Sequence, residues 1–309
     1  MDKAVSDNSL IIRNGTKAEI LLVGNGINRA FSEKSWEEII QECAKNNNVS
    51  YDKDIYNKMP YNMQIVVATG DNVDKSMKKL CDSMRQIPVI DEQKAFIGKL
   101  LDLPFTHILT SNYTYEIEKT VKECKRYNIV KTDKNGRAVN DMMLHRPIVM
   151  KYGNSERYIW HIHGHVGAAN SIVMGHYYYG KLLGRIQKYV PSFLKRYNGC
   201  CKYEKNCSVQ SWVDLFMTGN VHILGLGMDF TENDLWWLVC CKKRHFPESR
   251  IYFYEPAENI DLDKRRMMEC YNIYIPELHV YNNNYIDFYH SAIELIQKNL
   301  TGGDTNNIR

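Results

Sequence analysis

Short apolar runs alternate with amphipathic stretches along most of the chain. Continuous apolar runs are typical of strands buried in a parallel sheet, whereas apolar residues at every third or fourth position indicate helices. The runs predict strands at 18–23, 105–109, 127–131, 147–152, 157–162, 171–174, 221–224 and 250–254. Helical spacing predicts helices at 36–43, 59–68, 73–84, 91–101, 115–124, 181–189, 209–217 and 235–239, and a last helix–strand–helix at about 261–299. This alternation predicts an α/β fold with a mainly parallel sheet and helices on both faces.

The candidate site motifs, described below, follow predicted strands and are spread from Gly24 to Asp229, which favours one domain over two in series. We therefore expect a single domain at 1–300. A helical insertion at about 35–104 follows the first glycine loop, and a smaller insertion lies at about 166–218. The polar tail at 301–309 is expected to be disordered.

Composition narrows the class of protein. The chain has 309 residues of which 44% are hydrophobic, enough for a packed core. Its nine cysteines and the lack of an apolar leader in the first residues favour reduced thiols in the cytoplasm. The longest apolar stretch, Leu235–Cys241, is far shorter than the roughly 20 residues that span a bilayer. A net charge of +4 is too small to imply direct nucleic-acid binding.

The first predicted strand ends in a glycine loop, Gly24-Asn25-Gly26, that leads into a helix containing Asn28 and Arg29. Backbone N–H groups at such a turn, with an arginine close by, suit a pyrophosphate. The third glycine of the dehydrogenase pattern G-x-G-x-x-G is replaced by Arg29. A tight turn without a ligand is the alternative.

A second glycine loop, Gly225-Leu226-Gly227, is followed by Asp229, Glu232 and Asp234. Carboxylates there would repel pyrophosphate but accept hydrogen bonds from ribose hydroxyls. We therefore assign phosphate to the first loop, and sugar or backbone contacts to the second. Asp229 and Glu232 also have capping-box spacing, so a helix cap is an equal interpretation of Asp229.

Two further strand ends carry candidate catalytic residues. Asn112 could orient a sugar hydroxyl or a water, or could be a simple turn former. His161, His163 and His165 would share one face if the strand continued, which would favour a metal site; Gly164 is expected to end the strand first. The sequence contains no G-x-x-x-x-G-K-[ST] phosphate loop, G-x-S-x-G elbow or H-E-x-x-H motif.

Taken together, four loops resemble those of the sirtuins, and in particular the bacterial sirtuin-like proteins of anti-phage defence. They are Gly24-Asn25-Gly26-Ile27-Asn28, Thr110-Ser111-Asn112-Tyr113, His163-Gly164 and Gly225-Leu226-Gly227-Met228-Asp229-Phe230, and the likeness spans about 18–256. It implies a Rossmann-type sheet that binds NAD, with Asn112 and His163 at the nicotinamide ribose. The implied NAD contacts are Gly24, Asn25, Gly26, Asn28, Arg29, Tyr113, Gly225, Gly227 and Asp229.

The chain departs from the family in two places. Relatives usually carry an aspartate where this chain has Thr114. Sirtuin deacylases also hold a four-cysteine zinc module between the His-Gly pair and the second glycine loop, an interval that here contains only Cys200, Cys201 and Cys207. We therefore expect no zinc and little support for a deacylase.

The resemblance and the residues together predict an NAD⁺ glycohydrolase that releases ADP-ribose and nicotinamide. Nicotinamide is a cationic leaving group, so the carboxylate pair of ordinary glycosidases is dispensable. Asn112 would orient water and ribose, and His163 would act as the base. An NAD-dependent protein deacylase and a non-catalytic NAD or ADP-ribose sensor are the alternatives. Because free NAD⁺ hydrolysis would kill the host, we expect gating by homo-oligomerisation or by a regulatory or ATPase partner.

Overall fold

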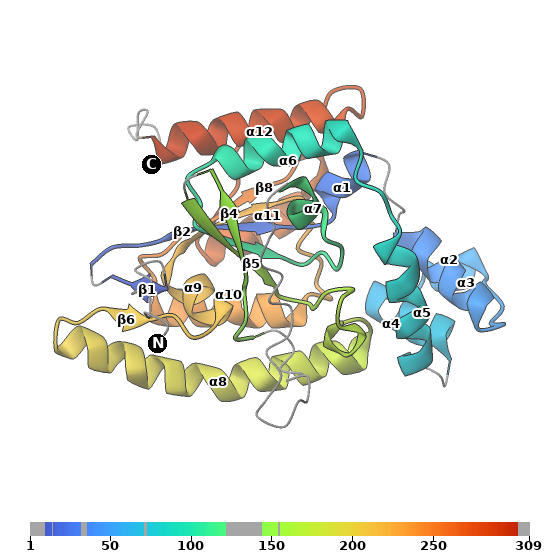
Figure 1. The fold of residues 1–309 in the computed structure, drawn as a ribbon, viewed down its shortest axis with the longest axis horizontal. Helices are drawn as coiled ribbons and strands as arrows, with labels where there is room; N and C mark the ends of the chain where they lie inside the picture. Colours follow the sequence, from blue (N-terminus) through green and yellow to red (C-terminus); the bar gives the residue numbers. More distant parts are fainter. Residues whose placement is uncertain are drawn as a thin grey trace, which may run out of the picture.

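A seven-stranded sheet forms the centre of the molecule (Figure 1). The computed structural model describes residues 10–13, 15–31, 36–70, 73–121, 144–153 and 155–301. In the order in which they lie side by side, the strands are β4 (Ile148–Tyr152), β5 (Ser155–His161), β3 (His107–Thr110), β2 (Glu19–Val23), β7 (Asn220–Leu224), β8 (Ile251–Tyr254) and β9 (Ile273–Tyr274). Every neighbouring pair is parallel except β4 and β5. The predicted α/β fold with a mainly parallel sheet is therefore confirmed.

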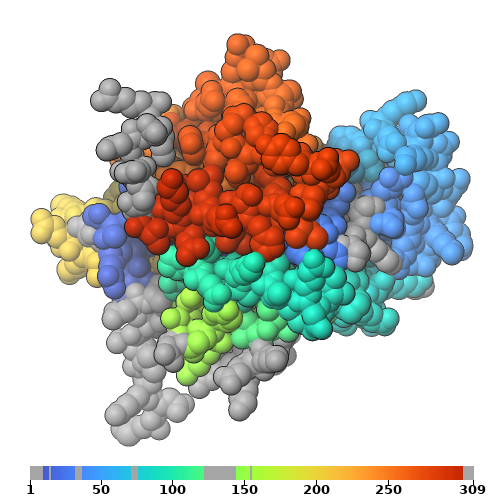
Figure 2. Space-filling model, turned by 90° about the horizontal axis from the view of Figure 1, so that it is seen from above, coloured from blue at the N-terminus to red at the C-terminus, as the bar shows by residue number. Residues whose placement is uncertain are grey.

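Helices cover both faces of this sheet, because alternate strand residues point to opposite sides. On one face, Leu21 and Ile108 pack with α1 (Gly26–Ala30), α6 (Asp91–Asp102), α7 (Glu116–Thr120) and α12 (Tyr285–Leu300). Figure 2 shows α12 and α6 side by side over this face. On the other face, Leu22 and Ile223 pack with α8 (His176–Lys202), α9 (Trp212–Thr218), α10 (Asn233–His245) and α11 (Leu262–Cys270).

A third apolar cluster belongs to the helices that follow the first glycine loop. These are α2 (Trp36–Asn46), α3 (Lys53–Tyr56), α4 (Tyr61–Thr69) and α5 (Val73–Arg85), which stand to one side of the sheet in Figure 1. The predicted helices of this segment are confirmed. The last of them, α6, packs on the sheet and not with α2–α5, because Phe96 and Leu100 lie in the same core as Leu21 and Ile108.

The second predicted insertion differs most from expectation. The strand predicted at 171–174 is wrong: a short 3₁₀ turn, η1 (Ala169–Ser171), precedes irregular backbone. Ile172 and Met174 are apolar because they pack against the α2–α5 cluster, and not because they join a sheet. Cys200 and Cys201, expected in a polar loop, lie on the last turn of α8.

The remaining short elements complete the description. They are β1 (Ile11–Ile12), which pairs with β6 (Cys207–Ser208), and a 3₁₀ turn, η2 (Ala257–Asn259). The strand predicted at 127–131, the end of the helix predicted at 115–124 and residues 302–309 of the predicted disordered tail lie outside the described residues. No helix in the described part of the chain is long and apolar enough to cross a bilayer.

The two glycine loops are in direct contact, which leaves no room for a side chain at Gly24. The Gly24 N–H donates to the Leu224 carbonyl (2.9 Å), and the Gly26 N–H donates to the Gly225 carbonyl (2.7 Å). A Cβ on Gly24 would overlap the Gly225 carbonyl oxygen and Leu226. Gly24 therefore lets the first loop pack against the second.

We expect Gly24→Ala to lower the free energy of unfolding by about 1–3 kcal/mol, because the added methyl group has no space. Gly184→Ala is the matched control: it lies within α8, where an added Cβ meets nothing within 4 Å. That control should be neutral or stabilising by about 0.5–1 kcal/mol, since alanine is the better helix former. Urea unfolding measures both, and equal stabilities would contradict the packing account.

Candidate functional site

A cavity of about 530 Å³ opens at the carboxyl ends of the central strands. It lies beside the glycine loops that follow β2 and β7, where ligands bind in open parallel sheets. Nine of the eleven predicted site residues line it: Asn25, Gly26, Arg29, Asn112, Tyr113, His163, Gly225, Gly227 and Asp229. Loops separated by as many as 200 positions along the chain thus meet at one cavity.

The other two predicted residues, Gly24 and Asn28, support the cavity without lining it. Asn28 is buried, and its Nδ2 donates to Oδ1 of Asn25 (3.0 Å). Its own Oδ1 accepts a hydrogen bond from Nε2 of Gln93 on α6 (3.0 Å). Asn28 therefore ties the first glycine loop to α6 and does not line the cavity itself.

The expectation of free backbone N–H groups in the first loop is wrong for Gly24 and Gly26, whose N–H groups donate to carbonyls at the end of β7 and in the second loop. Arg29, the positive charge predicted to bind a pyrophosphate, does line the cavity. Among the described residues that line the cavity, Arg29 is the only lysine or arginine. Its side chain is exposed.

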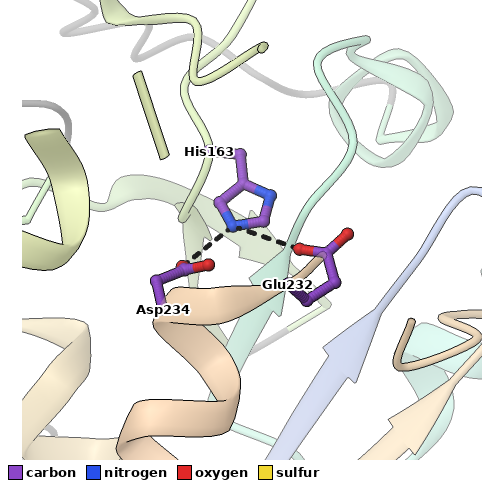
Figure 3. A group of neighbouring side chains, drawn as sticks. All are labelled: His163, Glu232 and Asp234. Atoms are coloured by element: carbon purple, nitrogen blue, oxygen red, sulfur yellow. Dashed lines mark hydrogen bonds and ion pairs between the residues drawn. The ribbon is translucent and has the colours of Figure 1, made fainter. Parts of the chain in front are cut away.

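His163 forms an acid–base group with two carboxylates (Figure 3). Gly164 follows it with φ of +83°, so the chain turns just beyond the end of β5. His163 Nε2 lies 3.0 Å from Oδ2 of Asp234 and 3.8 Å from Oε2 of Glu232. Both carboxylates come from the beginning of α10. His163 and Asp234 are almost fully buried, and Glu232 lines the cavity.

The surroundings shift the pKa values of this group. Burial lowers the pKa of His163, but the charges of Asp234 and Glu232 and the hydrogen bond to Asp234 outweigh it, so the pKa lies above its usual value. Burial, aided by the charge of Asp234, raises the pKa of Glu232 to about 7. The Tyr179 hydroxyl donates to Oε2 of Glu232 (3.2 Å). Within this group Glu232 therefore titrates near neutral pH, the range in which acid–base catalysis operates.

The predicted capping box is wrong. Helix α10 begins at Asn233, and the Glu232 side chain makes no capping hydrogen bond. Asp229 Oδ1 instead accepts the N–H of Thr231 (2.8 Å), two residues on. Glu232 is thereby left to turn toward His163, which the spacing in the sequence did not reveal.

The three alternating histidines do not share one face. His161 and His165 lie together with ring centroids 5.4 Å apart, whereas His163 contacts Asp234. Within the described residues, the one group whose ligand atoms all lie within 4.8 Å of one another is His163, Glu232 and Asp234. This group could hold a divalent cation. It contains His163 of the histidine run, but its other two members come from the beginning of α10 and not from the run.

Asn112 is held at three points at the end of β3. Its N–H donates to Oγ1 of Thr110 (3.1 Å), and its carbonyl lies 2.8 Å from Nδ1 of His161. Its side-chain Nδ2 donates to Oε1 of Glu116 (2.5 Å). Its Oδ1 is buried and has no hydrogen-bond partner in the described structure. Such an atom is costly unless a ligand completes it.

A second group of cavity residues was missed in the sequence. Glu255 follows β8 directly, and its Oε1 accepts a hydrogen bond from Nδ2 of Asn259 (2.8 Å). Both residues line the cavity with Tyr285 and Tyr289 of α12. Burial raises the pKa of Glu255. An acid directly after a buried strand was the available signal.

The pKa shifts predict how stability depends on pH. Glu232 is protonated in the folded state up to about pH 7, whereas its usual pKa is 4.5, so the folded state binds more protons between these values. The free energy of unfolding should therefore fall, by roughly 3 kcal/mol, as pH rises through this window. The raised pKa of His163 acts in the same direction above pH 6.5.

Glu232→Gln should remove the part of this decrease between pH 4.5 and 7 and keep the part above it that belongs to His163. Urea unfolding of both proteins across this range measures the difference. Parallel curves for the variant and the wild type would contradict the assignment to Glu232.

Comparison with protein-family models and with curated protein sequences finds no match for this chain.

Proposed function

We propose that the protein is an NAD⁺ glycohydrolase of the sirtuin-like type. The observation that carries the proposal is that Asn112, His163 and both glycine loops line a single cavity. These are the residues that the resemblance to the sirtuin-like proteins brings to NAD⁺.

The order of the strands supports a Rossmann-type fold. Numbered along the chain, the six parallel strands β2, β3, β5, β7, β8 and β9 lie in the order 3-2-1-4-5-6. This is the order of the dinucleotide-binding sheets, which bind their ligand where the order reverses. In this chain that point lies between β2 and β7, whose glycine loops both line the cavity.

The charges in the cavity suit NAD⁺. Arg29 offers a cation to the pyrophosphate. Glu232 lines the cavity and can accept hydrogen bonds from ribose hydroxyls, and the buried Asp234 carboxylate behind His163 favours the positively charged nicotinamide ring. Glu255 and Asn259 offer the same kind of acceptors to the second ribose.

The chemistry follows from these positions. A water oxygen attacks the anomeric carbon of the nicotinamide ribose, and the C–N bond breaks with its electron pair moving to the ring nitrogen, which becomes neutral. Asp234 accepts a hydrogen bond from Nε2–H of His163, so the imidazole keeps its lone pair at Nδ1 to take the proton of the water. Oδ1 of Asn112 accepts a hydrogen bond from that water or from a ribose hydroxyl.

The experiment is to incubate the purified protein with NAD⁺, with and without an acyl-lysine peptide, and to follow nicotinamide and ADP-ribose by mass. Equal amounts of both products without peptide would support the hydrolase. Nicotinamide release that requires the peptide would indicate the deacylase. Tight NAD⁺ binding without turnover, with or without other cell proteins added, would indicate the sensor.

We place the hydrolase in anti-phage defence, where homo-oligomerisation or a regulatory partner would control its activity.

A further inference from the structure

Apart from the His163–Asp234 pair, the carboxylate of Glu116 is a buried acid next to the cavity residue Asn112. It lies at the beginning of α7 and is 3% exposed. Its Oε1 accepts a hydrogen bond from Nδ2 of Asn112 (2.5 Å), and its Oε2 accepts one from Oγ1 of Thr114 (2.6 Å). One carboxylate thus binds the proposed catalytic asparagine and the threonine that stands where relatives have an aspartate.

The charge of Glu116 is balanced nearby. His161 lies against two acceptors, the Asn112 carbonyl at Nδ1 and Oε1 of Glu118 at Nε2 (2.8 Å each). Burial lowers the pKa of His161, but Glu118, the Asn112 carbonyl and Glu116 outweigh it and raise the pKa above its usual value. Both ring nitrogens thus face acceptors, which favours the protonated ring, and a positive charge there stabilises the carboxylate of Glu116.

The pairing decides which way the Asn112 amide faces. A side-chain amide has a donor end and an acceptor end, which exchange places when the group rotates by half a turn. A carboxylate accepts hydrogen bonds and cannot donate them, so Glu116 binds the NH₂ end. The acceptor Oδ1 is then the end left without a partner, at a residue that lines the cavity.

We propose that Glu116 is a positioning residue that locks the Asn112 amide with its oxygen toward the substrate, so that this contact selects a hydrogen-bond donor such as a ribose hydroxyl or the attacking water. This inference rests on the proposed function of the cavity. It also explains how the chain functions with Thr114: the threonine hydroxyl binds the second oxygen of Glu116 and so fixes the carboxylate.

A reversal of polarity tests the proposal. Asn112→Asp places a carboxylate against Glu116, and we expect it to lower kcat for NAD⁺ hydrolysis at least about 100-fold. Adding Glu116→Gln supplies an NH₂ group that donates to the new aspartate, while Oε1 still accepts from Thr114. The double variant presents an acceptor to the cavity again, so we expect it to be at least about 10-fold faster than Asn112→Asp alone.

Glu116→Gln by itself should lower kcat by no more than about 10-fold, since the glutamine oxygen can still accept from Asn112. The matched control combines Asn112→Asp with Glu118→Gln, which removes the same charge two positions along α7 but from a side chain that contacts His161. This control should not recover activity. A double variant no faster than Asn112→Asp, in a series whose wild type is active, would overturn the inference.

A ligand-free measurement separates this inference from the proposed function. We expect the side-chain amide protons of Asn112 to exchange slowly with solvent by NMR, and to lose this protection in Glu116→Ala. If the wild type releases no nicotinamide but shows this pattern, the proposed function fails and the positioning role stands. Protection that persists in Glu116→Ala would overturn the positioning role, whatever the activity.

Discussion

His163→Ala is expected to lower kcat for NAD⁺ hydrolysis by about 10²–10⁴-fold, the usual contribution of a positioned base. The imidazole is the only group in the acid–base cluster of Figure 3 that is a base in its neutral form and is paired with a buried carboxylate. KM should change much less than kcat, because the proton transfer belongs to the transition state. Steady-state kinetics with nicotinamide as the measured product give both values.

His222→Ala is the matched control for this prediction. His222 is also buried and also paired with a carboxylate, Oε2 of Glu19 at 2.9 Å from its Nε2, but it lies within β7 and not at the cavity. The control should lower stability and leave kcat of the folded protein within about 3-fold. If both variants lost activity equally, the loss would reflect folding and not catalysis.

His163, Glu232 and Asp234 could instead bind a metal ion, and the NAD⁺ hydrolysis assay can distinguish this role from acid–base catalysis. If His163, Glu232 and Asp234 held a divalent cation, a chelator would abolish hydrolysis and added Mg²⁺, Mn²⁺ or Zn²⁺ would restore it. With His163 as the base, hydrolysis should be unchanged by the chelator. Chelator-sensitive activity would contradict the role given to His163.

Asn112→Ala is expected to lower kcat roughly 100-fold, because it removes the oriented acceptor at the reacting sugar. It also leaves Glu116 with one hydrogen bond fewer, so a modest loss of stability should accompany it. Asn220→Ala is the control, since Asn220 lies at the amino end of β7, away from the cavity, and bonds Glu19 and the Arg250 N–H. Activity retained by Asn112→Ala would contradict the role of the amide.

Much of the sheet could be predicted from the sequence, because buried strands are short continuous apolar runs. β2, β3, β5, β7 and β8 all lie where such runs occur, and the first four are followed by the residues taken as candidates. The cavity follows from this placement, since the ends of parallel strands meet at one edge. The same rule failed at 171–174, where an apolar run packs under neighbouring helices without pairing.

The partners of the candidate residues could not be predicted in the same way. Asp234 reaches His163 across 71 positions, and only the fold shows that their side chains meet. Asn28 had the residue type of a ligand contact, but its amide is used by Asn25 and Gln93. Glu116 had no signal at all, because a charged residue in the first turn of a helix is ordinarily solvated.

The most direct test is hydrolysis in water enriched in ¹⁸O, with NAD⁺ as the only substrate. We expect the wild type to release nicotinamide and an equal amount of ADP-ribose carrying one ¹⁸O atom at the anomeric carbon. His163→Ala and Asn112→Ala should release at most a few per cent of this amount. The proposed mechanism is wrong if either variant forms the ¹⁸O-labelled product at the wild-type rate, or if the wild type forms no product with a gating partner supplied.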